Sequence, residues 1–154
     1  MDMNTLGLRA SPTEVTFCVY DTVKNVILNV EEIKIPNALN MPDKLKYLRA
    51  TILDVLREYQ IIKAGIRLTE HSAMSSSPER IQIEGVLQEA FASSTLKNYF
   101  QGALVTIASK LNTDKTTLSN LIKTSSEYDA IDNWCDFNVK EREAILVALG
   151  AINV

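Results

Sequence analysis

The spacing of apolar residues in the first 35 positions constrains the fold of this chain more than any other feature. Apolar runs at residues 6–11, 15–21 and 23–35 are separated by short polar breaks, the first of them at Pro12-Thr13. In the second run the apolar character alternates with a period of two, which is typical of a β-strand. Asn25 suits the positive φ of a tight turn between the second and third runs. The pattern predicts three consecutive antiparallel strands.

The rest of the chain alternates helical and extended patterns. Apolar residues recur at helical spacing after Pro42, and the short, almost wholly apolar run at 61–68 is typical of a strand covered on both faces. Ser76 or Ser77 is expected to cap the next helix, and residues 125–137 are the least regular part. The predicted helices are 42–59, 78–91, 103–111, one that begins at Thr113 or Asp114, and 138–150; the predicted later strands are 61–68 and 95–100.

Length, charge and cysteine content exclude several classes of protein. The chain has 154 residues, enough for one domain with a sizeable core, and its net charge of −3 gives no global electrostatic preference for nucleic acid. Cys18 and Cys135 lack the spacing of a metal site or a redox motif, and Cys18 is expected in the core. No apolar run is long enough for a membrane span and no signal peptide is evident, so a cytoplasmic location is expected.

The element order β-β-β-α-β-α-β-α-α-α resembles the RNase H-like superfamily, and within it the RuvC-like branch related to Holliday-junction resolvases. It is also similar to small bacterial proteins of this fold that have degenerate active-site residues and share an Ile-Arg at the end of the fourth strand. The residues that carry the resemblance are Leu6-Gly7-Leu8-Arg9-Ala10-Ser11, Ala64-Gly65-Ile66-Arg67, the helix 78–91 with Gly85, and Glu143-Ala144-Ile145-Leu146-Val147-Ala148-Leu149.

This resemblance implies one RNase H-like domain over residues 1–154. The expected architecture is α/β: a mixed five-stranded sheet whose first three strands are antiparallel, flanked by helices on both faces. Members of the superfamily hold two divalent metals with carboxylates from the first strand, the fourth strand and the last helix. Two such metals stabilise the attacking and leaving oxygens of a phosphodiester.

The chain departs from the superfamily at these metal-binding positions. The first-strand position is Arg9 and the fourth-strand position is Arg67, whereas the last helix retains Glu143. Lys140 stands one turn before Glu143, where a second acid is common in the family. Mg²⁺ prefers oxygen ligands, and a guanidinium cannot provide one. The sequence therefore predicts that this protein is not a metal-dependent nuclease of the usual kind, with no metal and no other cofactor.

Two interpretations of the arginines remain open. If the first and fourth strands pair, Arg9 and Arg67 lie side by side and need an anion between them. One alternative is a site for a phosphate or a partner at the place where relatives bind metal. The other, which we favour, is a salt bridge from both arginines to Glu143 that links the sheet to the last helix.

Other charged and aromatic residues have structural interpretations that outweigh the functional ones. Glu70 and His71 follow the fourth strand and are weak candidates for acid–base catalysis, but no nucleophile has a recognisable spacing to them. Positive charges on the helix 42–59 are interleaved with acids, which favours a solvated face. Trp134, in the irregular segment, is expected to anchor that segment to the body, with a lid or partner loop as the alternative. The positive charges are Lys44, Lys46, Arg49 and Arg57, and the other aromatic residues are Tyr128 and Phe137.

The preferred function is therefore a non-catalytic RNase H-like module that binds nucleic acid or a protein partner. The alternative is a divergent, Mg²⁺-dependent nuclease or resolvase with Glu70, Glu84 or Glu143 as rearranged ligands. It predicts that several of these carboxylates converge within a few ångströms. A homodimeric structural protein is a third hypothesis, because relatives of this fold often pair.

Overall fold

The computed structural model describes residues 3–72, 74–123 and 126–154. Ala73, in the predicted loop after the fourth strand, and Ser125, at the start of the predicted irregular segment, lie outside the described residues. None of the helices in the described ranges is both long and apolar enough to cross a membrane. The elements are β1 (Asn4–Ala10), β2 (Glu14–Asp21), β3 (Val26–Lys34), α1 (Met41–Glu58), β4 (Ile61–Arg67), α2 (Pro78–Ala92), β5 (Asn98–Gly102), α3 (Leu104–Lys110), α4 (Lys115–Lys123), a 3₁₀ turn (Trp134–Asp136), α5 (Val139–Gly150) and a last 3₁₀ turn (Ala151–Asn153).

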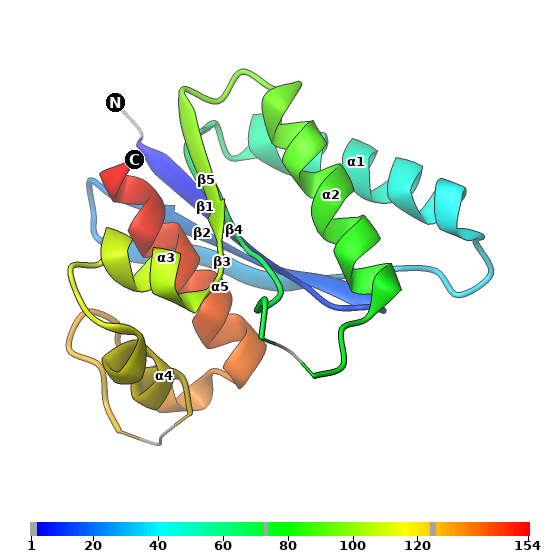
Figure 1. Cartoon of the computed structure of the whole chain (residues 1–154). Coiled ribbons are helices and arrows are strands. Elements are labelled where there is room, and N and C mark those ends of the chain that lie inside the picture. The colour runs from blue at the N-terminus through cyan, green and yellow to red at the C-terminus, as the bar shows by residue number, and fades with distance from the viewer. Residues whose placement is uncertain (1–2, 73, 124–125) are drawn as a thin grey trace.

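The five strands form one mixed sheet in the order β3-β2-β1-β4-β5. β1, β2 and β3 form an antiparallel meander, whereas β4 joins β1 and β5 joins β4 in parallel. Figure 1 shows β1 running through the middle of the molecule, with the two termini near each other at one end. The predicted α/β fold, with its three antiparallel first strands, is confirmed.

Helices cover the sheet on two sides and enclose two apolar clusters. α1 and α2 pack over one face, and α5 packs with α3 and α4 over the other (Figure 1). The period-two alternation of β1 assigns Leu6 and Leu8 to the cluster under α1 and α2, so Gly7 and Arg9 face α5. This alternation determines which helix the charged end of β1 meets.

Gly7 allows α5 to lie directly against β1. A Cβ atom at this position would be 2.0 Å from the main-chain oxygen of Ala144 and 2.4 Å from the main-chain nitrogen of Ala148. Any larger residue would push the helix away from the sheet, because both neighbours are backbone atoms. The close approach brings Glu143, the residue before Ala144, next to the end of β1.

Local signals located most element ends correctly. Asn25 has the predicted positive φ of 56°, and Asn138 with Glu141 forms the predicted capping box of α5. Of the two serines expected to cap α2, Ser77 is the cap, since its Oγ accepts from the Arg80 N–H. One expectation needs correction. The last strand begins at Asn98 rather than residue 95, because residues 94–97 form a turn after α2.

Candidate anion-binding site

Arg9 and Arg67 lie side by side at the carboxyl ends of β1 and β4. The parallel register makes them direct partners across the two strands. Both face α5, because Leu8 and Ile66, one position earlier in each strand, belong to the cluster on the opposite face. The sequence therefore places two guanidinium groups next to each other beneath the first turns of α5.

Glu143 lies between the two arginines. Arg9 Nε donates to Glu143 Oε2 at 2.9 Å, and Arg67 Nε donates to Glu143 Oε1 at 2.9 Å. Each arginine also donates from Nη1 to the main-chain carbonyl of the next residue, Ala10 or Leu68. The side chains are 15%, 7% and 6% exposed for Arg9, Arg67 and Glu143, so this is a buried triad of two cations and one anion. The salt bridge favoured from the sequence is present, and Glu70, whose Oε1 lies 3.4 Å from Arg67 Nη2, adds a second negative charge beside the two arginines.

A third cation, Lys140 on α5, lies at the same end of the sheet. Lys140 Nζ donates to Glu14 Oε1 at the start of β2. This hydrogen bond is the main reason why the pKa of Glu14 falls to about 2. The pair ties the first turn of α5 to β2, and Lys140 occupies the position where the family resemblance implies an acid.

Arg80 supplies a fourth cation from the first turn of α2. Its Nε lies 2.8 Å from Glu84 Oε2 but without the alignment of a hydrogen bond, and its Nη2 is buried with no hydrogen-bond partner in the described part of the chain. Glu84 in turn accepts from the main-chain N–H and the hydroxyl of Thr69. Burial, and then the positive charge of Arg9, lower the pKa of Arg80. A buried donor without an acceptor costs free energy, so the site favours an additional anion here.

The four cations line one hollow of about 360 Å³. Among the described residues that line it, Glu70 is the one carboxylate, and hydroxyl groups complete the wall between β4 and α2. Hydroxyls and guanidinium groups together are the usual donors to phosphate oxygens. The lining consists of Arg9, Ser11, Pro12, Arg67, Thr69, Glu70, Ser75, Ser76, Ser77, Arg80 and Lys140; we call it the cation pocket.

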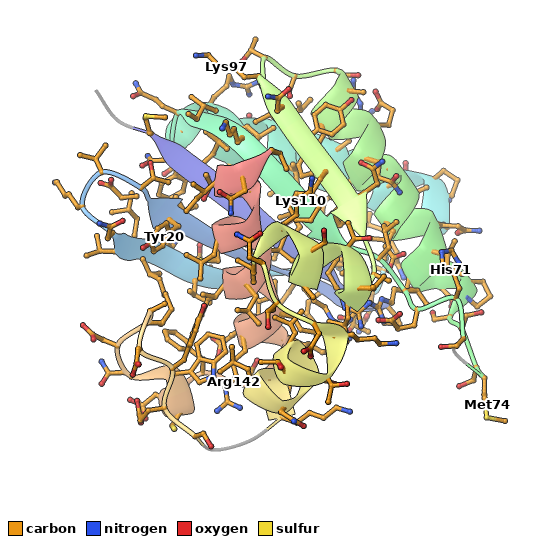
Figure 2. The ribbon with its side chains drawn as sticks, turned by 60° about the vertical axis from the view of Figure 1, so that its left-hand side comes forward. Tyr20, His71, Met74, Lys97, Lys110 and Arg142 are labelled. Carbon is orange, nitrogen blue, oxygen red and sulfur yellow. The ribbon has the colours of Figure 1, made fainter. Side chains whose placement is uncertain are left out.

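Glu70 and His71, the weak candidates for acid–base catalysis, both line a hollow of about 370 Å³ beside the cation pocket. Glu70 Oε1 accepts from the Leu104 N–H at 3.0 Å and lies 3.4 Å from Arg67 Nη2, so it holds the start of α3. His71 is exposed, and Ile81, Glu84 and Gln88 line the same hollow. Figure 2 shows His71 at the edge of the molecule, on the loop that leads from β4 to α2.

The carboxylates near this end of the sheet do not form a two-metal donor set. Glu70 accepts from the Leu104 N–H and Glu84 from the Thr69 N–H, while Glu143 accepts from Arg9 and Arg67. Among the described residues, no three His, Cys, Asp or Glu side chains gather in a way that could hold a metal ion. Two arginines at the center of the site do not fit the Mg²⁺ chemistry implied by the resemblance.

The remaining sequence candidates have the structural roles favoured for them. On α1, Arg49 pairs with Glu89, and Arg57 pairs with Asp54, at the exposed surface. Trp134 is completely buried, and its ring lies edge-on to that of Tyr128 with 5.1 Å between the ring centroids. It therefore anchors the irregular segment, whose described residues are 126–137, to the body of the protein.

Arg80 is the site residue that the sequence analysis missed. The sequence offered one indication of its role: a cation in the first turn of a helix is unfavourable next to the positive end of the helix dipole, so another interaction must compensate for it. Its position against the arginine pair depends on how α2 crosses the end of β4, which spacing along the chain does not show.

Comparison with solved structures identifies the fold. No protein-family model matches the sequence, and no curated protein matches it. RuvC of Thermus thermophilus is similar with a TM-score of 0.66 and 11% identity, over 96% of this chain and 92% of that chain. The same organism's RuvC in complex with a Holliday junction substrate is similar with a TM-score of 0.60 and 13% identity, over 96% of this chain and 91% of that chain. The yeast mitochondrial Holliday junction resolvase Ydc2 is similar with a TM-score of 0.54 and 14% identity, over 97% of this chain and 77% of that chain. The chain therefore has the RNase H-like fold of RuvC and related Holliday junction resolvases.

Proposed function

We propose that this protein binds the phosphate backbone of a nucleic acid in the cation pocket and does not cleave it by metal-dependent chemistry. The observation that carries the proposal is Arg80 Nη2, a buried donor with no described acceptor, in a hollow that three further cations line. An incoming phosphate oxygen would supply the missing acceptor and relieve the repulsion between Arg80 and Arg9.

The fold supports nucleic acid as the source of the phosphate. One solved protein of this fold is a RuvC in complex with a Holliday junction substrate. The family resemblance implies that catalysis on a phosphodiester takes place where the first strand, the fourth strand and the last helix meet, which is the position of Arg9, Arg67 and Glu143 here. An anion site at that position suits a backbone that is held there but not attacked.

The competing proposal, a divergent nuclease, needs carboxylates that are available to a metal. Glu143 accepts from two arginines, Glu84 accepts from Thr69 and pairs with Arg80, and Glu70 accepts from the start of α3. Releasing any of them would leave a buried cation or amide unpaired, at a cost of about 1–3 kcal/mol or more. The donor chemistry therefore favours binding without cleavage.

Fluorescence anisotropy with labelled single-stranded, duplex and four-way DNA tests the binding. Arg80→Gln removes the charge that has the fewest partners, so we expect Kd to rise at least about tenfold, because a charged hydrogen bond is worth ~1.5 kcal/mol or more. The matched control is Arg57→Gln, which removes an exposed arginine on α1 and should leave Kd unchanged. Equal affinities for Arg80→Gln and the control, with both proteins folded by circular dichroism, would overturn the proposal.

A further inference from the structure

α3 and α4 form a helix-turn-helix unit at one side of the molecule. The two helices are separated by residues 111–114, and Asn112 within this turn has a positive φ of 56°. A turn of three or four residues between two short helices, with a left-handed residue that is often glycine, is the pattern of the DNA-binding motif of that name. Asparagine is one of the few other residues that adopt this conformation readily.

The interior of the unit has the side chains such a motif needs. Ala108 is buried where the chain turns back, and its carbonyl accepts from the Thr113 N–H at 2.9 Å. Asp114 caps α4, because its Oδ1 accepts from the Thr117 N–H at 2.7 Å. Apolar residues from both helices then share one cluster with α5; they are Ile107, Ala108, Leu118 and Ile122.

The last turn of α4 is fixed to the body of the protein from within. Arg142 Nη1 donates to the Ile122 carbonyl at 2.8 Å, and Trp134 Nε1 donates to the Leu121 carbonyl at 2.9 Å. Figure 2 shows Arg142 close to α4, and Figure 1 shows α4 at the outer edge of the molecule, away from α1 and α2. One side of α4 is therefore held rigidly, while the other faces outward.

The outward side of α4 is polar and carries two lysines, while Asp114, which caps the helix, is an exposed acid beside the first of them. Its exposed residues are Lys115, Thr116, Thr117, Asn120 and Lys123. The helix contains no Asp or Glu, although the chain as a whole has a net charge of −3. None of the exposed large apolar side chains lies on α4, every residue of which is described, although Thr117 and Asn120 line an open hollow of about 600 Å³ with Leu121 and Tyr128.

We infer that the α3–α4 unit is a second nucleic-acid contact, with α4 inserted in the major groove of duplex DNA. The major groove of B-form DNA admits a helix, and lysine, threonine and asparagine are side chains that contact base edges and phosphates there. The major groove of duplex RNA is too narrow and deep to be read in this way. The inference rests on the proposed binding function and adds to it a second surface and a preference for duplex DNA. The contact at α4 and the contact at the cation pocket can each fail without the other.

The unit lies next to the cation pocket. Glu70, which lines that pocket, accepts from the Leu104 N–H at the start of α3. A nucleic acid whose backbone enters the pocket is therefore near α3, and α4 follows after one short turn.

The test removes two lysines from α4 and compares them with two exposed lysines elsewhere. Lys115→Ala/Lys123→Ala should raise the Kd for a duplex DNA of mixed sequence about tenfold and lower the salt slope by about 2, as expected for two lost phosphate contacts. Lys46→Ala/Lys97→Ala is the matched control; Lys97 lies at the far end of the molecule from Arg142 (Figure 2) and should have no effect. Acetylation of wild-type lysines with and without the duplex should show protection of Lys115 and Lys123, and no protection of Lys46 and Lys97.

Equal Kd values for the α4 variant and its control, or unprotected α4 lysines in the complex, would overturn the inference. The inference would also be overturned if the α4 variant lost as much affinity for duplex RNA as for duplex DNA. The same holds if a protein, and not DNA, protected the α4 lysines from acetylation. If Arg80→Gln weakens binding while the α4 variant does not, the cation pocket stands and the α4 contact falls. The reverse result removes the pocket and retains the α4 contact. A wild-type protein that binds no nucleic acid removes both.

Discussion

Arg142 and Glu143 are adjacent on α5, both are charged and both are buried, yet they act on opposite regions of the molecule. Glu143 points to the sheet and meets two arginine side chains. Arg142 points to α4 and the irregular segment, where it donates to the main-chain carbonyls of Ile122, Trp134 and Cys135. Two adjacent residues of the helix thus belong to different regions: Glu143 interacts with charged side chains, and Arg142 holds main-chain carbonyls in place.

The difference indicates what each region is suited to do. Around Glu143, cations from β1, β4, α2 and α5 crowd a hollow, and one of them has a buried donor without a described acceptor. Around Arg142, the cation holds the ends of a helix and a loop in place. The first region is suited to receive an anion, and the second is suited to support the surface that α4 presents.

Removing Glu143 should have the largest effect on stability. Glu143→Ala leaves two buried guanidinium groups facing each other, so we expect the free energy of unfolding to fall by about 3–5 kcal/mol. Urea denaturation measures this, with the exposed Glu32→Ala as the control. A loss below about 1 kcal/mol would show that the triad is open to water and that the contrast with Arg142 is wrong.

Replacing the whole triad sharpens the same comparison. Arg9→Met/Arg67→Met/Glu143→Leu exchanges three buried charges for apolar groups, which is often neutral or stabilising. We expect this variant to lose less stability than Glu143→Ala, because no buried charge is left unpaired and only the Ala10 and Leu68 carbonyls lose their donors, while it loses nucleic-acid affinity. Retained affinity would place the binding site elsewhere.

Removing Arg142 should cost less and act locally. Arg142→Met leaves main-chain carbonyls without their charged donor, so we expect a loss of about 1–3 kcal/mol. Hydrogen exchange should accelerate in α4 and residues 126–137 more than in β1. Uniform acceleration across the sheet would contradict the assignment of Arg142 to main-chain support.

The ion pair between Glu14 and Lys140 should give the smallest effect. The pKa of Glu14 is about 2 in the folded protein against 4.5 ordinarily, so its contribution is present above pH 4.5 and is lost as the pH falls toward 2. Because Lys140 is partly exposed, we expect less than about 1 kcal/mol. Between pH 7 and pH 3, the wild type should therefore lose slightly more stability than Lys140→Met; an identical loss in both would contradict the pairing.

Apolar runs and their spacing were enough to predict most of the helices and strands. The resemblance to the RNase H-like superfamily then implied how these elements assemble, and with that the pairing of Arg9 with Arg67 and the bond from both to Glu143. The homodimer and the cytoplasmic location stay predictions.

What the sequence did not reveal depends on contacts between distant elements. Arg80 joins the cation pocket through the crossing of α2 over β4, and the role of Gly7 depends on the approach of α5. The sequence predicted α3 and α4 as two separate helices. That they form one helix-turn-helix unit depends on the conformation of Asn112 and on the burial of Ala108, which the sequence pattern does not show.

The central claim, binding without metal-dependent cleavage, is tested most directly by following binding and cutting in one sample. A labelled four-way DNA junction is incubated with the wild-type protein and Mg²⁺, and is then run on native and denaturing gels. We predict a shifted band on the native gel and intact strands on the denaturing gel. Strands cut only when Mg²⁺ is present, and left whole by a folded Glu143→Gln variant that still shifts the junction, would contradict the account.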